Sequence, residues 1–189
     1  MQSEAVRELK DCWGQVARGE LAESADLERA VGEVFVVLRD PIYRYVFSTV
    51  RNAGDAEDLT QETFIRLLRD LRRGHAIENV KAWLFRVAHN LVIDFSRRAP
   101  VPESLDAAAN QRMTEGVPDP SPSAEERALD SASRCRLLRS LAPQERRCME
   151  LRAEGLRYRE IAEILGIKIP TVQTTLDRAI RKIVEQRNA

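Results

Sequence analysis

Acidic side chains are concentrated in one short segment of the sequence. The stretch DAEDLTQETF, residues 55–64, holds four carboxylates in ten residues: Asp55, Glu57, Asp58 and Glu62. Paired carboxylates can transfer protons or bind a metal ion, and an acidic surface can also bind a basic partner. The function of this segment therefore depends on the other groups that the chain supplies.

The chain lacks the companions that would turn these acids into a catalytic or metal-binding centre. Cys12, Cys135 and Cys148 are far apart and form no C-x-x-C pair, and the histidines are His75 and His89. Zinc sites and disulfide frameworks need closer spacing. The sequence contains no recognisable nucleophile with its base and no glycine-rich phosphate loop. It predicts a protein that is not an enzyme and that needs no metal ion or cofactor.

Length and hydropathy place the chain among globular proteins. Its 189 residues are 43% hydrophobic and 32% charged, enough for one large domain or two small ones. No run approaches the roughly 20 apolar residues of a membrane span, and residues 1–24 lack the apolar core of a signal peptide. We therefore expect a cytoplasmic protein without membrane insertion.

The net charge of zero is a sum of large opposing terms. Residues 1–62, 63–98, 99–133 and 134–189 carry net charges of −6, +5, −5 and +6. Clustered Lys and Arg attract a phosphate backbone whatever the total charge. The two basic blocks therefore indicate two anion-facing surfaces, although a solvated surface with uneven patches gives the same blocks.

A proline-rich segment divides the chain. Residues 99–123 hold five of the eight prolines and almost no apolar periodicity, which is typical of a linker. The sequence therefore predicts an N-terminal extension at 1–24, a domain at 25–98, a flexible linker at 99–123 and a second domain at 124–189.

Apolar residues recur at helical rather than strand spacing throughout, so the predicted fold class is all-α, with two small helical domains. We expect a helix over 30–50 that is interrupted or kinked near Pro41, a helix capped by Asp55, and a helix capped by Asn79. The predicted buried stripe of the second helix is Ala56, Leu59, Thr60, Thr63, Phe64, Leu67, Leu68 and Leu71, and that of the third is Val80, Trp83, Leu84, Val87, Leu91 and Phe95.

The second domain is predicted to hold four helices, at about 125–140, 144–154, 157–165 and 170–186. Pro143 starts one helix, and Gly155 and Gly166 follow helix ends. The last two helices, with Gly166 between them, form a predicted helix-turn-helix, a motif whose second helix can enter a DNA major groove. Their predicted apolar faces are Ile161, Ala162 and Leu165, then Val172, Leu176, Ile180 and Ile183.

Two motifs in this order resemble the extracytoplasmic-function group of bacterial sigma-70 factors. The N-terminal motif is DAEDLTQETFIRLLRDL followed by AWLFRVAHNLVIDFSRR, and the C-terminal one is LAPQERRCMELRAEGLRYREIAEILGI followed by TVQTTLDRAIRKI. The resemblance covers roughly residues 30–186. It implies a subunit that binds core RNA polymerase, directs it to promoters and helps to open the promoter DNA.

The resemblance also assigns roles to residues. It implies docking of the acidic helix on the clamp helices of the largest catalytic subunit, contact with the flap of the second subunit, and an anti-sigma factor as inhibitor. The implied polymerase-binding residues are Asp55, Glu57, Asp58, Gln61 and Glu62. The implied contacts to the start-proximal promoter element are Asn79, Lys81, Trp83, Arg86, His89, Asn90, Arg97 and Arg98. The implied contacts to the upstream element are Arg157, Arg159, Thr171, Gln173, Thr174, Thr175, Arg178, Arg181 and Lys182.

Some of these residues have competing interpretations. Trp83 lies on the apolar stripe, which favours core packing, and a histidine such as His89 more often packs partly than reads bases. Where many relatives have T-V-K-S-R, this chain has TVQTT at 171–175, so two positive charges are missing. Gln173 can still pair with adenine, and threonine methyls can touch thymine.

Two other functions remain open from the sequence alone. A stand-alone dimeric helix-turn-helix regulator would account for the C-terminal half, but it leaves the acidic helix, the basic helix and the linker unexplained. An interaction-only protein that binds polymerase or an inhibitor, but no promoter, would fit the missing charges.

Overall fold

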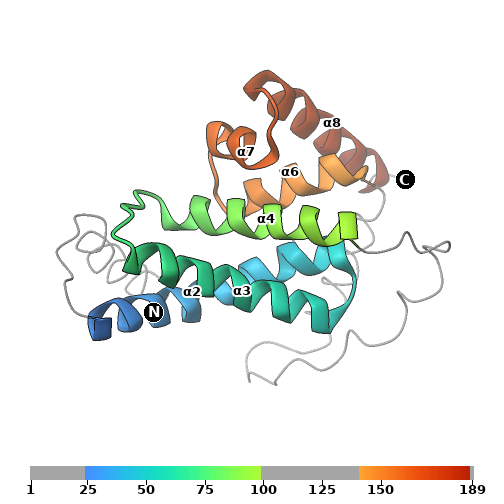
Figure 1. Cartoon of the computed structure of the whole chain (residues 1–189). Helices are drawn as coiled ribbons and strands as arrows, with labels where there is room; N and C mark the ends of the chain where they lie inside the picture. The colour runs from blue at the N-terminus through green and yellow to red at the C-terminus, as the bar shows by residue number, and fades with distance from the viewer. Residues whose placement is uncertain (1–23, 99–140, 188–189) are drawn as a thin grey trace, which may run out of the picture. The chain divides into compact units, whose positions relative to one another are not determined.

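The computed structural model of the protein describes residues 24–98 and 141–187 (Figure 1). Every regular element in these two ranges is an α-helix, which confirms the predicted fold class. The chain divides into two units, one with α2, α3 and α4 and the other with α6, α8 and the greater part of α7. The predicted linker, the helix at 125–140 and nearly all of the extension lie outside the described residues.

Helix α2, Ser24–Val50, is one continuous helix that contains Pro41. Of the two predicted alternatives at Pro41, the interruption is therefore wrong, and the kink stays a prediction. A proline inside a helix removes one backbone hydrogen bond, but the residues around it are anchored in the core: Leu38 before it and Ile42 and Val46 after it are buried. Burial of such side chains stabilises by roughly 1.5–3 kcal/mol each, enough to offset the missing bond.

Helix α3, Ala53–Arg72, begins two residues before the predicted cap. Asn52 is the N-cap, because its side-chain oxygen accepts a hydrogen bond of 3.1 Å from the backbone N–H of Asp55. Asp55 therefore lies in the first turn, and its prediction as the cap is wrong. The predicted stripe is confirmed, with all of its members buried or half-buried. Thr60 and Thr63 are accommodated because their hydroxyls donate to helix carbonyls at 2.7 Å.

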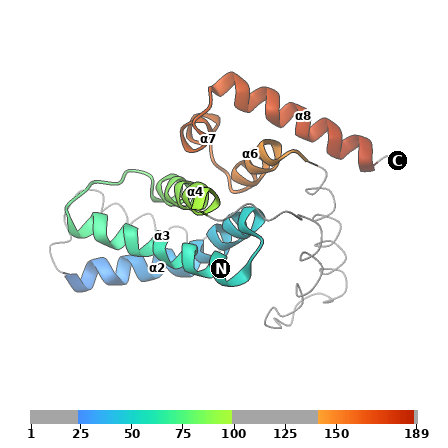
Figure 2. The ribbon, with the colours of Figure 1, turned by 45° about the vertical axis from the view of Figure 1, so that its right-hand side comes forward.

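Helix α4, Val80–Arg98, begins after Asn79 as predicted, and the Asn79 side chain accepts from the N–H of Ala82 at 3.1 Å. Its buried face is only partly the predicted one. The helix packs against both α2 and α3 (Figure 2), so its buried face includes residues outside the predicted stripe. The buried residues of α4 are Leu84, Phe85, Ala88, His89, Leu91 and Val92, whereas Val80, Trp83, Val87 and Phe95 are half-buried.

Aromatic rings hold the three helices of the first unit together. Phe35 and Phe64 join α2 to α3 with ring centroids 4.9 Å apart, edge to face. Tyr45 and Phe85 join α2 to α4 in the same way at 5.5 Å. Such pairs add roughly 0.5–1.5 kcal/mol to the burial of their area. They hold α3 and α4 against α2.

The second unit follows the predicted order: α6, Pro143–Ala153; α7, Tyr158–Leu165; and α8, Ile169–Arg187. Pro143 occupies the first turn of α6. Gly166 has φ +64°, a left-handed conformation that ends α7 and lets the chain turn into α8. The predicted helix-turn-helix is therefore present.

The apolar face of α8 is shifted from the predicted one. Val172 and Leu176 are buried as predicted, together with Ala179. Ile180, however, is 49% exposed, so its prediction as a core residue is wrong. Ile180 lies four residues after Leu176, which is compatible with a helical repeat of 3.6 residues. In the structure, however, the buried residue at this position of the helix is its neighbour Ala179.

One ion pair ties α6 to α8. Glu145 is 3% exposed, and its two oxygens lie 2.8 and 3.0 Å from Nζ of Lys182. Glu145 also accepts a hydrogen bond of 2.9 Å from the backbone N–H of Ala142. These donors, Lys182 first, lower the pKa of Glu145 despite its burial.

Candidate polymerase-docking and DNA-binding surfaces

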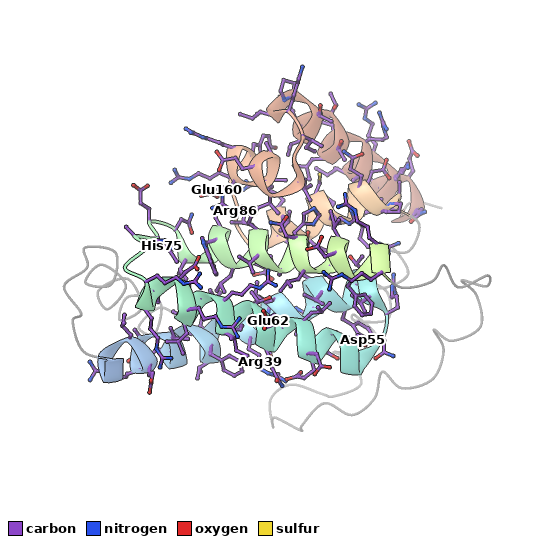
Figure 3. All side chains as sticks on the ribbon, viewed as in Figure 1. Arg39, Asp55, Glu62, His75, Arg86 and Glu160 are labelled. Atoms are coloured by element: carbon purple, nitrogen blue, oxygen red, sulfur yellow. The ribbon has the colours of Figure 1, made fainter. Side chains whose placement is uncertain are left out.

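The outward side of α3 carries the acidic residues that the sequence singled out. Asp55 and Glu62 lie along this helix in Figure 3, with Arg39 of α2 beside it. Asp58 is exposed, and Asp55 and Glu62 are half-buried. The structure therefore brings the five predicted docking residues onto one helix, but it gives them different surroundings.

Two of the four acids are held by arginines of the same unit. Glu57 receives two hydrogen bonds from Arg39 of α2, at 2.8 and 3.0 Å. Glu62 receives one from Arg66 at 2.9 Å, and Arg69 lies 3.7 Å away. The pKa of Arg39 is raised, chiefly by its hydrogen bond with Glu57. The charges of Glu57 and Glu62 are thus largely balanced inside the protein.

The carboxylates of Asp55 and Asp58 have no cationic partner among the described residues. Asp55 lies in the first turn of α3, where the helix dipole favours a negative charge. Asp58 lies one turn further along and is exposed. These two acids give the surface its unbalanced negative charge. We call Asp55, Asp58 and Gln61 the open acidic face.

The exposed side of α4 carries polar and cationic groups. Trp83, Arg86, Asn90 and Arg97 are spaced by three, four and seven residues, so they share one face of the helix. Arg86, Asn90 and Arg97 are exposed, while Trp83 is half-buried. Figure 3 shows Arg86 on this helix. Of the remaining predicted contacts on this unit, Asn79 and Arg98 are exposed and Lys81 is half-buried.

His89 does not belong to this surface. Its side chain is 4% exposed, and Nδ1 lies 2.8 Å from the hydroxyl of Tyr45, with which it shares a hydrogen bond. Tyr45 is itself 3% exposed. The prediction of His89 as a DNA contact is therefore wrong for this conformation, because the imidazole is enclosed between α2 and α4.

The helix-turn-helix presents most of its predicted contacts. Arg157 and Arg159 are exposed at the start of α7, and α8 exposes Thr171, Gln173, Thr174, Arg178 and Arg181. Thr175 is 8% exposed and faces the core, so its prediction as a base contact is wrong. Lys182 is exposed over 41% of its side chain, but its ammonium group is bound to Glu145.

Several surface residues could not be recognised from the sequence. Ile169 at the start of α8 is 46% exposed and Val184 near its end is 50% exposed. Apolar residues in a helix are ordinarily assigned to the core. The only available signal for Ile169 was its position beside Pro170, ahead of the periodic residues of α8.

The described residues contain no group of acids, histidines and cysteines that could hold a metal ion. Cys148 is buried, and burial raises the pKa of its thiol to about 11. A neutral, enclosed thiol is a poor nucleophile. Within the described ranges, no helix is both long and apolar enough to span a bilayer.

Two family models match the chain, one on each unit. Sigma-70 region 2 matches residues 17–100, and sigma-70 region 4 matches residues 136–183. The first covers the acidic α3 and the basic face of α4, and the second covers the helix-turn-helix.

Among curated proteins, the chain is 33% identical to the ECF RNA polymerase sigma factor BldN of Streptomyces coelicolor, over 87% of this chain and 63% of that protein. It is 34% identical to the ECF sigma factor SigE of Mycolicibacterium smegmatis, over 76% of this chain and 56% of that protein. It is 33% identical to the RNA polymerase sigma factor YlaC of Bacillus subtilis, over 73% of this chain and 80% of that protein. The chain thus spans less than two thirds of BldN and SigE and most of YlaC.

Solved structures that share the fold include CnrH and RpoE. CnrH, in complex with the cytosolic domain of CnrY, matches with a TM-score of 0.61 over 94% of this chain and 95% of that one, at 20% identity. The sigma factor RpoE of Bartonella quintana, in complex with the anti-sigma factor NepR, matches with a TM-score of 0.60 over 84% of this chain and 96% of that one, also at 20% identity.

Proposed function

Because the chain belongs to the extracytoplasmic-function group of the sigma-70 family, we propose that it binds core RNA polymerase and directs it to specific promoters. One observation carries this proposal: regions 2 and 4 match in that order on one chain, each on its own folded unit. A stand-alone regulator would leave region 2 without a role.

In this proposal the open acidic face docks on the polymerase. Asp55 and Asp58 keep unbalanced charge because no arginine of the described unit binds them. Complementary charge accelerates association and fixes the orientation of a partner. These two acids and Gln61 would therefore meet the clamp helices, while Glu57 ties α3 to α2 through Arg39 and Glu62 pairs with Arg66 of its own helix.

The exposed side of α4 would bind the start-proximal promoter element and help to open it. Opening a duplex requires groups that bind unpaired bases and the displaced strand: cations, polar edges and aromatic rings. Arg86, Asn90 and Arg97 supply the first two, and the half-buried Trp83 offers the edge of a ring. His89 has no part in this contact.

The helix-turn-helix would bind the upstream element, with α8 in the major groove. Arg178 and Arg181 are exposed there and would contact phosphates. The second unit would also meet the flap of the second catalytic subunit. Catalysis would remain with the polymerase, and the protein would act in the cytoplasm.

An anti-sigma factor is the expected inhibitor. The structurally similar RpoE was solved with the anti-sigma factor NepR, and CnrH with the cytosolic domain of CnrY. A partner that covers the surface used for polymerase would silence the protein until it is released.

Reconstituted transcription tests the proposal. The purified chain and core polymerase are mixed with a library of promoter fragments, and transcripts are counted with each component alone and with both. Specific transcripts only with both components support a sigma factor. Tight operator binding by the chain alone, without polymerase, would show a stand-alone regulator instead. Polymerase binding without transcription from any fragment would show an interaction-only protein.

A further inference from the structure

The exposed start of α8 has no cationic side chain. Ile169, Pro170, Thr171, Gln173 and Thr174 are exposed in its first two turns. The first cation of the helix is Arg178, more than two turns from its start, and Lys168 lies in the turn before it. Within the helix, the exposed residues best placed to meet base edges are therefore uncharged, and the exposed Lys168 directly precedes them.

This composition disfavours guanine. In the major groove guanine presents two acceptors, N7 and O6, which Arg or Lys bind most often. Among the exposed side chains of these two turns, Gln173 alone carries N–H donors, and Thr171 adds one hydroxyl. The hydroxyl of Thr174 donates its hydrogen to the carbonyls of Pro170 and Thr171 at 3.1 Å, so that donor is already used within the helix.

Asp177 disfavours direct contact with guanine but does not by itself select A·T pairs. It is exposed one turn beyond Gln173, and no described residue binds its carboxylate. A carboxylate accepts hydrogen bonds only, so it is repelled by the acceptors of guanine and favours an edge with an amino group, that of adenine or cytosine. Because cytosine pairs with guanine, the choice of A·T over G·C pairs rests on Gln173 and Ile169 rather than on Asp177.

Ile169 supplies an apolar contact instead of a hydrogen bond. It is the largest apolar side chain at the start of the helix, and 46% of it is exposed to water. The only apolar group that a base presents in the major groove is the C5-methyl of thymine. Contact between the two would remove apolar surface of both from water.

We infer that the start of α8 reads A·T base pairs in the upstream promoter element, with Ile169 against a thymine methyl and Gln173 on an adenine. This inference rests on the proposed function and adds to it the class of bases that the second unit selects. The adjacent cations, Arg178 and Arg181, contribute affinity without selecting bases.

The test uses the holoenzyme formed from the full chain and core polymerase. Holoenzyme is first selected on promoters with a randomised upstream element. Thymine at each enriched position is then replaced by deoxyuridine, which pairs identically but lacks the methyl group. We expect A·T enrichment and about threefold to fivefold weaker binding at one deoxyuridine position.

Substitutions on α8 test which residues contact the thymine methyl and the adenine. Ile169→Ala should abolish the difference between thymine and deoxyuridine, and Gln173→Ala should reduce the preference for one adenine by about tenfold. Val184→Ala is the matched control, because Val184 is an aliphatic residue of the same helix with 50% exposure, far from its start. This control should retain the full difference between thymine and deoxyuridine.

The outcomes distinguish failure of this inference from failure of the proposed sigma-factor function. Enrichment of guanine opposite the start of α8 in an active holoenzyme, or an unchanged thymine preference in Ile169→Ala, would overturn the inference alone. Absence of specific transcription from every library member would overturn the proposed function and the inference with it.

Discussion

Two of the ion pairs that link helices in the described residues differ in burial, and the difference shows which charges serve the fold. Arg39 and Glu57 join α2 to α3 at the surface, with side chains 39% and 34% exposed. Lys182 and Glu145 join α8 to α6 around a carboxylate that is 4% exposed. Water reaches both charges of the first pair, but in the second it reaches the ammonium group and not the carboxylate. A charged residue on a predicted binding face can therefore belong to the fold, as Lys182 does.

The largest expected effect concerns the buried pair. Lys182→Met leaves Glu145 without its ammonium partner, and an unpaired buried group costs roughly 1–3 kcal/mol, or more if charged. Arg39→Met should cost less than about 1 kcal/mol, because its pair is exposed. Hydrogen exchange of amides in α6 and α8, and separately in α2 and α3, measures both. Equal losses in the two units would contradict the distinction.

Acid should destabilise the second unit through the same carboxylate. The folded-state pKa of Glu145 lies below its ordinary value of 4.5, because Lys182 donates to the charged form. The stabilisation is therefore complete above the unfolded-state pKa and is lost as pH falls through the lower folded-state pKa. Below about pH 4.5 the free energy of unfolding should fall more steeply in the native chain than in Glu145→Gln, measured by exchange in α6 and α8. Parallel curves would rule out the role of this pair.

The next effect compares open and paired acids on α3. Asp58→Lys should weaken polymerase binding by about tenfold, since it reverses an unbalanced charge at the proposed interface. Glu57→Gln should change affinity less, because Arg39 already balances Glu57. Titration of labelled core polymerase gives both constants, and circular dichroism checks that helix content is retained. A stronger effect of Glu57→Gln would place the contact on the paired acids instead.

The smallest effect concerns phosphate contacts on α8. Arg181→Ala should weaken promoter binding a few-fold on every sequence and reduce the slope of log affinity against log salt by about 1. Lys182→Gln should change this slope less, because Glu145 holds its ammonium group. A salt series with holoenzyme on one promoter compares the two variants. Equal slope changes would show that Lys182 leaves Glu145 to bind DNA.

Local signals were sufficient for most element boundaries. Asn79, Pro143 and Gly166 act on the few backbone groups beside them, so their effects can be read from the sequence. Asn52 rather than Asp55 caps α3, because several neighbouring side chains of this type compete for the same amides. Such competition is resolved only when the backbone geometry is known.

Side-chain surroundings were harder to predict, because they depend on residues distant in sequence. Glu57 meets Arg39 from 18 positions away, and Glu145 meets Lys182 from 37. The buried face of α4 was misjudged for the same reason, since two helices cover it and a single period describes one contact only. His89 was thus predicted as a DNA contact, although it lies in the core.

The hydrogen bond between Tyr45 and His89 sets the rotation of α4 about its own axis. Apolar contacts tolerate a roll of the helix, because one methyl group can replace another. A bond of 2.8 Å between two buried polar atoms does not, since a shift by one residue turns the helix by about 100° and separates them. A buried side chain therefore determines that Arg86 and Asn90, and not their neighbours, are the residues that α4 exposes to solvent.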